Sequence, residues 1–292
     1  SYYFPIFKSY PETTFGGAFE TETNYHTPAI VRQIKAHGWL IMPAIPYRYD
    51  THDFSSNEPQ PAPPSWRHYL GTDDQARDIV ARILYGLRIS VVFGFTLTLL
   101  SLVVGVIFGA ACGYYGGMLD LVLQRFLEIW SGLPTLYLLI ILSSFMQPSF
   151  FLLLLVMLLF SWTRFVGVIR AEFLRARTLP YVSAARALGI CDRKIIVHHI
   201  LPNAFVATLS LLPWHIIGGI MSLTSLDFLG FGLPIGSASL GELVSQAKSN
   251  LHAPWIGLSV FVTLFVILGL LVFIGEGIRD ALDPHNSDVI HE

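Results

Sequence analysis

Residues 181–203 read Tyr181-Val-Ser-Ala-Ala-Arg-Ala-Leu-Gly189 and run on through Ile190-Cys-Asp-Arg-Lys194 to Ile200-Leu-Pro202-Asn203. This short polar and basic segment lies between two long apolar ones. Its alanines favour a helix that Gly189 ends, and a second helix is predicted from Asp192 until Pro202 removes a backbone donor. Two short helices joined at a glycine would form a compact surface that another protein can bind. An ordinary basic loop beside a membrane would look the same, so spacing alone leaves both interpretations open.

The composition excludes an ordinary soluble protein. Of the 292 residues, 53% are hydrophobic and only 13% are charged, whereas average soluble chains carry about 25% charged residues. The chain has no Gly-Lys dipeptide for a Walker-type phosphate loop, no nucleophile elbow and no HExxH motif. Cys112 and Cys191 lie in different environments and predict neither a disulfide nor a metal site. We therefore expect no catalytic residues, no metal and no cofactor in this chain.

Apolar runs of spanning length dominate the sequence after residue 88. We predict an all-α polytopic membrane protein with five spans, at residues 89–113, 121–146, 149–169, 205–226 and 256–277. Pro134 and Pro213 lie within the second and fourth spans and predict kinks. Gly105, Gly109 and Gly113 repeat at four-residue spacing, which predicts a face for close helix packing.

The sequence before the first span predicts two further regions. Residues 1–70 are rich in proline and aromatic residues and contain no spanning run, so we expect an extramembrane region there. Gly71-Thr-Asp-Asp74 resembles a helix cap, and apolar and charged residues alternate at helical spacing after it. Residues 71–88 are therefore predicted to form an interfacial amphipathic helix, followed by a transmembrane domain over residues 89–292.

The distribution of Lys and Arg predicts the orientation. Loop 227–255 carries only Lys248, whereas loop 170–204 carries six basic residues: Arg170, Arg175, Arg177, Arg186, Arg193 and Lys194. Loop 170–204 and the C-terminus are thus expected on the cytoplasmic side, and residues 1–88 on the outer side. In a bacterial inner membrane, the outer side is the periplasm.

The segment quoted first resembles the EAA loop of ABC-importer permeases, in which Glu-Ala-Ala is followed at fixed spacing by Gly and Leu-Pro. Ala184, Ala185, Gly189 and Leu201-Pro202 fall on that pattern, while Ser183 replaces the Glu and His199 the Ile. The resemblance extends over residues 70–284 and is to the dipeptide and oligopeptide family. Within that family, Asp227-Phe-Leu-Gly-Phe-Gly-Leu-Pro234 most resembles permeases of oligopeptide and microcin C importers.

The resemblance implies a type I importer permease bundle and a set of partners. These are a second permease in a heterodimer, two ATPase subunits or a fused ATPase that bind ATP and Mg, a periplasmic peptide-binding protein and membrane lipid, but no nucleic acid. It also implies a six-helix core, so a further helix is expected ahead of residue 1. The coupling loop, residues 172–203, would dock the ATPases through these residues: Tyr181, Ser183, Ala184, Ala185, Arg186, Ala187, Leu188 and Gly189.

Ionisable residues near the spans are candidates for the translocation path, because charge is costly in lipid. We predict Glu128, Asp227 and Phe228 as path or gate residues. Glu128 could instead simply pair with Arg125, one turn away, and Arg164 and Arg170 could extend to the cytoplasmic side. Two alternatives remain for the function: an ATP-independent channel or secondary transporter, and a membrane-embedded enzyme, which the lack of a convergent catalytic set disfavours.

Overall fold

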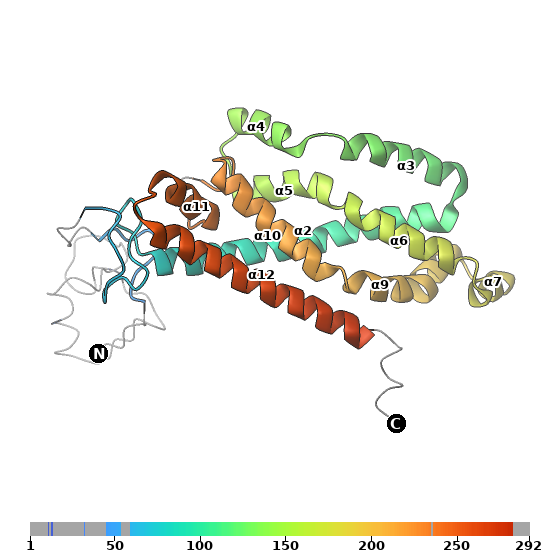
Figure 1. Ribbon diagram of the computed structural model, residues 1–292. Helices are drawn as coiled ribbons and strands as arrows, with labels where there is room; N and C mark the ends of the chain where they lie inside the picture. The colour runs from blue at the N-terminus through green and yellow to red at the C-terminus, as the bar shows by residue number, and fades with distance from the viewer. Residues whose placement is uncertain are drawn as a thin grey trace, which may run out of the picture. The chain divides into compact units, whose positions relative to one another are not determined.

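The computed structural model describes Pro11, Thr13, Arg32 and residues 45–53, 59–234 and 236–282. The chain divides into two compact units, residues 1–48 and 49–292, and each is described by itself. The first unit holds few described residues, so the fold predicted for residues 1–70 lies largely outside them. The second unit is built of helices (Figure 1).

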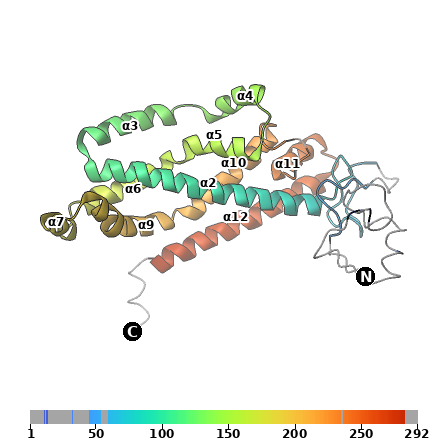
Figure 2. The ribbon, with the colours of Figure 1, turned by 180° about the vertical axis from the view of Figure 1, so that it is seen from behind.

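Helix α2, Ile79–Tyr115, is the longest helix in the described part of the chain and runs beside α6 and α10 (Figures 1 and 2). Asp78 caps it, since its Oδ1 accepts a hydrogen bond from the Ala81 N–H at 2.8 Å. Gly116, with a φ of 64°, ends it. One continuous helix thus includes both the end of the predicted amphipathic segment and the first predicted span.

The start of α2 differs from the prediction of a helix over residues 71–88. Asp73 Oδ1 accepts from the N–H groups of both Gln75 and Arg77 at 2.9 Å, which closes a turn rather than a helix. Residues 71–78 instead form isolated bridges, between His52 and Arg77 and between Thr72 and Asp78. The predicted cap signal belongs to this turn, and the helix begins at Ile79, about two turns later than predicted.

In the described residues, seven further helices follow the other predicted spans: α3 (Gly117–Ser131), α4 (Thr135–Phe145), α5 (Phe150–Ser161), α6 (Thr163–Ala176), α9 (Leu201–Leu209), α10 (Leu212–Phe228) and α12 (Pro254–Leu282). Helix α11 (Leu240–Ser249) lies instead within loop 227–255. Three unbroken stretches can cross a membrane by length and composition: Ile79–Tyr115, Phe150–Ala176 and Pro254–Ala281. Two bent pairs raise the number to five in the described residues, and the five correspond to the predicted spans.

Both predicted kinks are present. Pro134 caps α4, and the span is bent by 63° between Gly117–Ser131 and Thr135–Leu142. Pro213 lies in the first turn of α10, and the break before it bends that span by 56°. In each case proline follows the break, where its missing N–H costs no helical hydrogen bond.

The glycine repeat of α2 forms the predicted packing face. A Cβ atom on Gly105, Gly109 or Gly113 would lie 2.4–2.9 Å from the Cβ atom of Phe165, Ile169 or Phe173, respectively, on α6. The two four-residue repeats therefore interlock along most of α6. A second close crossing joins α2 to α10, where a Cβ on Gly219 would lie 2.9 Å from Cα of Gly94. These contacts fix α6 and α10 against α2.

Candidate functional site

Helix α7, Pro180–Ala187, lies at one end of the bundle, beyond α6 and α9 (Figures 1 and 2). Gly189 has a φ of 75°, in the left-handed region that favours glycine. Its N–H donates to the Arg186 carbonyl at 2.9 Å, and the Ile190 N–H donates to the Ala185 carbonyl at 3.1 Å. Helix α8, Asp192–Lys194, follows. The predicted order of helix, glycine turn and second helix is confirmed.

Apolar side chains hold α7 on the bundle. Val182 is fully buried and Ala185 is nearly so, within a core cluster that includes Phe173, Ile195 and Ile200. These partners come from α6 and from the helical segment after α8. Any displacement of α7 would therefore be transmitted to α6, and through the glycine face to α2.

Two polar contacts add to this attachment. The Tyr114 hydroxyl, near the end of α2, donates to Asp192 Oδ1 at 2.5 Å. The guanidinium of Arg186 lies 5.0 Å from the centre of the Tyr114 ring, within cation–π range. Tyr114 thus contacts both arms of the glycine turn and fixes the turn relative to α2.

The opposite side of α7 is accessible in this chain. Leu188 is 80% exposed, which is unusual for a large apolar side chain at the tip of a turn. The other exposed residues of this surface are Tyr181, Ser183, Ala184, Arg186, Ala187 and Gly189. Of the docking residues predicted from the sequence, Ala185 is the buried one, so it supports α7 from below. We call these exposed residues, with Leu188, the α7 surface.

The prediction that Pro202 ends the second helix is wrong. The helix continues from α8 through a π-helical stretch, Ile195–Ile200, directly into α9, and Pro202 lies in the first turn of α9. A wider π turn accommodates a residue that cannot donate its backbone hydrogen bond. The loop is thereby joined to the fourth span without a flexible break.

Glu128 lies on α3 and is paired with Arg125, as the simpler interpretation expected. Its Oε2 accepts from Arg125 Nη1 at 2.6 Å, and both side chains are exposed. This ion pair does not exclude Glu128 from the translocation path, and its role there stays a prediction. Its carboxylate nevertheless already has a cationic partner.

Asp227, near the end of α10, organises the loop that follows. It accepts hydrogen bonds from the Leu233 N–H at 2.6 Å and from the Ser239 hydroxyl. Gly232 and Gly241 pack so closely on this region that a Cβ on either would overlap Asp227. Phe228 lines the same pocket as Asp227, and Lys248 Nζ lies 5.7 Å from its ring centre. The geometry gives Asp227 a structural task, and a role for either residue in the path remains a prediction.

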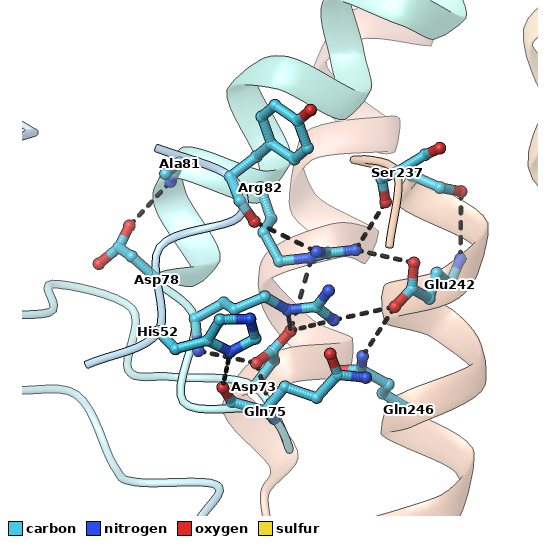
Figure 3. A network of polar contacts seen from close by, with 12 residues as sticks. His52, Asp73, Gln75, Asp78, Ala81, Arg82, Ser237, Glu242 and Gln246 are labelled. Atoms are coloured by element: carbon cyan, nitrogen blue, oxygen red, sulfur yellow. Dashed lines mark hydrogen bonds and ion pairs between the residues drawn. The ribbon is translucent and has the colours of Figure 1, made fainter. Parts of the chain in front are cut away.

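A buried charge network at the N-terminal end of α2 was not anticipated (Figure 3). Arg77 Nε donates to Asp73 Oδ2 at 2.7 Å, and Arg77 Nη2 donates to Glu242 Oε1 at 2.9 Å. Arg82 Nη2 donates to Glu242 Oε2 at 2.8 Å and to the Ser237 carbonyl at 2.9 Å. Asp73, Arg77 and Arg82 are each at most 1% exposed. The network therefore ties the segment before α2 to the start of α11.

The comparison with protein families identifies the chain. The model of the binding-protein-dependent transport system inner membrane component matches residues 105–288, more than half of the sequence. The chain belongs to this family. It is a multi-pass, non-catalytic ABC transporter permease, and ATP is bound by partner subunits of such systems.

Similar proteins and solved structures agree with this assignment. The permease is 52% identical to the "Inner membrane ABC transporter permease protein YejE" of Escherichia coli K12, over 98% of this chain and 84% of that protein. It is 51% identical to the "Peptidoglycan transport system permease protein YejE" of Agrobacterium fabrum, over 97% and 80%. The inward-facing MetNI methionine ABC transporter has the same fold, with a TM-score of 0.55, 17% identity and coverage of 70% and 98%. The resemblance seen in the sequence is confirmed.

The permease carries a second polar cluster next to the network. His68 Nδ1 lies 2.8 Å from Asp78 Oδ2, and His68 Nε2 lies 3.3 Å from Asp53 Oδ2. The hydrogen bond to Asp78, opposed by partial burial and reinforced by both carboxylates, raises the pKa of His68 above its ordinary value of 6.5. Arg67 also approaches Asp53, at 3.9 Å. The His68 ring thus bridges Asp53 to the cap of α2, and this bridge is strongest when the ring is protonated.

We predict that this bridge weakens as the pH rises. A pKa that is raised in the folded protein means that the contribution of His68 is complete below the ordinary pKa and is lost as the pH passes the raised value. The Asp53 N–H, which donates to the Ala76 carbonyl at 2.8 Å, should then exchange faster with solvent. Hydrogen exchange between pH 6 and 9, corrected for intrinsic rates, measures this. In His68→Gln the corrected rate should be independent of pH; an equal pH dependence in that variant would contradict the prediction.

Proposed function

We propose that this permease is one transmembrane subunit of an ATP-driven importer that moves peptides across the inner membrane by alternating access. The observation that carries the proposal is the α7 surface: an exposed helix with an apolar tip, fixed firmly to α2 and α6. Such a surface is suited to receive a partner and to transmit its movement to the spans. The cargo class is supported by the names of the relatives, one of which is a peptidoglycan transport permease.

In this proposal, the permease pairs with a second permease, two ATPase subunits or one fused ATPase act at the cytoplasmic face, and a periplasmic binding protein delivers the peptide. Residues 1–88 face the periplasm, and loop 170–204 and the C-terminus face the cytoplasm. The density of arginines around α7 supports this orientation. ATP-driven closure of the ATPases would move α7 as a rigid lever. Glu128, Asp227 and Phe228 remain our candidates for the path.

The test is uptake by the reconstituted complex. The permease is purified with its genomic neighbours and placed in liposomes, and a labelled peptide is supplied on its binding protein. We expect uptake that requires both ATP hydrolysis and the binding protein. The lone chain serves as the control, because a channel or a secondary transporter would work without partners. Uptake by the lone chain, without ATP, would contradict the proposal.

A further inference from the structure

A small polar cavity lies between the spans, at half their length. It has a volume of about 80 Å³ and is lined by residues of α2, α4, α5, α6 and α10. Its polar lining consists mainly of hydroxyl-bearing and basic side chains: Thr98, Ser101, Ser161, Arg164, His215 and Ser222. Neither Asp nor Glu is among the lining residues. A cavity with this lining favours an anion over a cation.

Arg164 lies far from both ends of the spans. Its neighbour Phe165 packs on Gly105, near the middle of the uncharged stretch 89–115 of α2. The cytoplasmic end of α2 is about 15 Å further along the helix, at about 1.5 Å per residue. An arginine side chain is too short to span that distance, so the expectation that Arg164 extends to the cytoplasmic side does not hold. Arg170 is partly exposed and paired with Asp120 at 2.6 Å.

Arg164 also differs from the other span arginines in its partners. Arg125 is paired with Glu128, Arg170 with Asp120, and Arg175 lies near Glu172. In the described part of the chain, no carboxylate lies within ion-pair distance of Arg164. An unpaired guanidinium within a membrane span is costly, so such a residue is a candidate for function. The side chain is exposed in this chain, toward the cavity and beyond it.

The guanidinium of Arg164 lies beside small, hydroxyl-bearing and aromatic neighbours. Its Nη1 is 3.5 Å from the position that a Cβ on Gly218 would occupy, so it lies along α10 where a side chain is missing. His215 packs its ring on Phe165, with ring centres 4.0 Å apart. The Ser101 and Ser161 hydroxyls bond to each other across α2 and α5. A planar fork of N–H donors is therefore presented with hydroxyl and imidazole groups beside it.

We propose that this cavity binds a carboxylate of the peptide during its passage, with Arg164 as the main ligand. The guanidinium fork pairs with a carboxylate through two parallel hydrogen bonds, and the neighbouring hydroxyls supply further donors. Every peptide with a free C-terminus carries such a group, so the site serves many sequences. This inference rests on the proposed function, because it takes the cargo to be a peptide.

The test compares one peptide without acidic side chains in two forms, the free acid and the C-terminal amide. Uptake of both is measured in the reconstituted complex, with wild type, Arg164→Gln and Gly218→Val. Dividing each variant rate by the wild-type rate for the same cargo cancels the preference of the binding protein. We expect Arg164→Gln to lower uptake of the free acid about tenfold, as for the loss of a hydrogen bond to a charged group. Uptake of the amide should be nearly unchanged. Arg279→Gln, at the end of α12, is the charge-matched control and should change neither.

Gly218→Val keeps the charge of Arg164 but fills the space beside its guanidinium. It should therefore reduce uptake of the free acid more than uptake of the amide. If the Arg164→Gln complex does not assemble, the Gly218→Val complex provides the test of the carboxylate site. Equal loss for the two cargoes would overturn the proposal and assign Arg164 to a carboxylate of the protein, either Glu128 or one on the second permease. If the wild-type complex takes up neither form of the peptide, the result contradicts the proposed function and, with it, the proposed carboxylate site.

Discussion

Replacing Gly189 by arginine is expected to release the ATPase subunits and to abolish uptake, while the permease remains in the membrane. Two effects combine. The φ of 75° at this position is unfavourable for any side chain, by about 1–2 kcal/mol. An added Cβ would meet nothing within 4 Å, so the arginine would project from the α7 surface into the space proposed for the partner. Tagged wild-type and variant permease, purified side by side, measure ATPase retention directly.

The chain offers a close control for this substitution. Gly117 also has a positive φ, 58°, is exposed, and leaves a Cβ without a neighbour within 4 Å. It lies in the turn after α2 rather than on the α7 surface, so Gly117→Arg should retain the ATPase. Gly189→Asn, which tolerates the left-handed conformation, should retain it in part. Normal ATPase retention and normal uptake in Gly189→Arg would remove the docking role from this helix.

The spans and their breaks were predictable because their causes are local. Lipid requires long apolar helices, and proline at positions 134 and 213 cannot donate within one. The glycine repeat of α2 was recognisable as a packing face for the same reason. The helix that packs on this face could not be predicted, since Phe165, Ile169 and Phe173 of α6 carry no matching sequence signal. The helix and glycine turn at Gly189 were predicted from residues that lie next to one another.

The buried charge network could not be predicted, since its members are distant in the sequence. Helical spacing placed Arg77 and Arg82 on a polar face, and an exposed face at the membrane interface was the simplest inference. Their main partner, Glu242, is 160 or more residues away, on another helix. The only local signal was a set of charges directly before a span, a place where charges are ordinary. Similarly, Asp227 looked like a path residue, although its contacts are with its own loop.

Removing the charge of Glu242 is expected to be among the most destabilising single changes in the permease. Each of its oxygens accepts from a different buried arginine, Arg77 or Arg82. In Glu242→Gln one acceptor becomes an NH₂ donor facing an arginine donor, and the cluster gains an uncompensated positive charge. Breaking a buried pair in this way typically costs about 3–5 kcal/mol. A clear fall in the melting temperature of the purified complex, with faster proteolysis near residues 71–78, is the expected result.

Glu172→Gln provides the matched comparison, because it also removes a carboxylate near an arginine. Its partner Arg175 is 3.9 Å away and largely exposed, so the pair is worth only about 0–1 kcal/mol and the melting temperature should hardly change. If both variants have the melting temperature of the wild type, the buried charges make no net contribution to stability, because the cost of desolvation cancels their attraction. If only Glu242→Gln melts early, the network holds the segment before α2 on α11. The packing at this end of the bundle then depends on contacts that no local sequence pattern encodes.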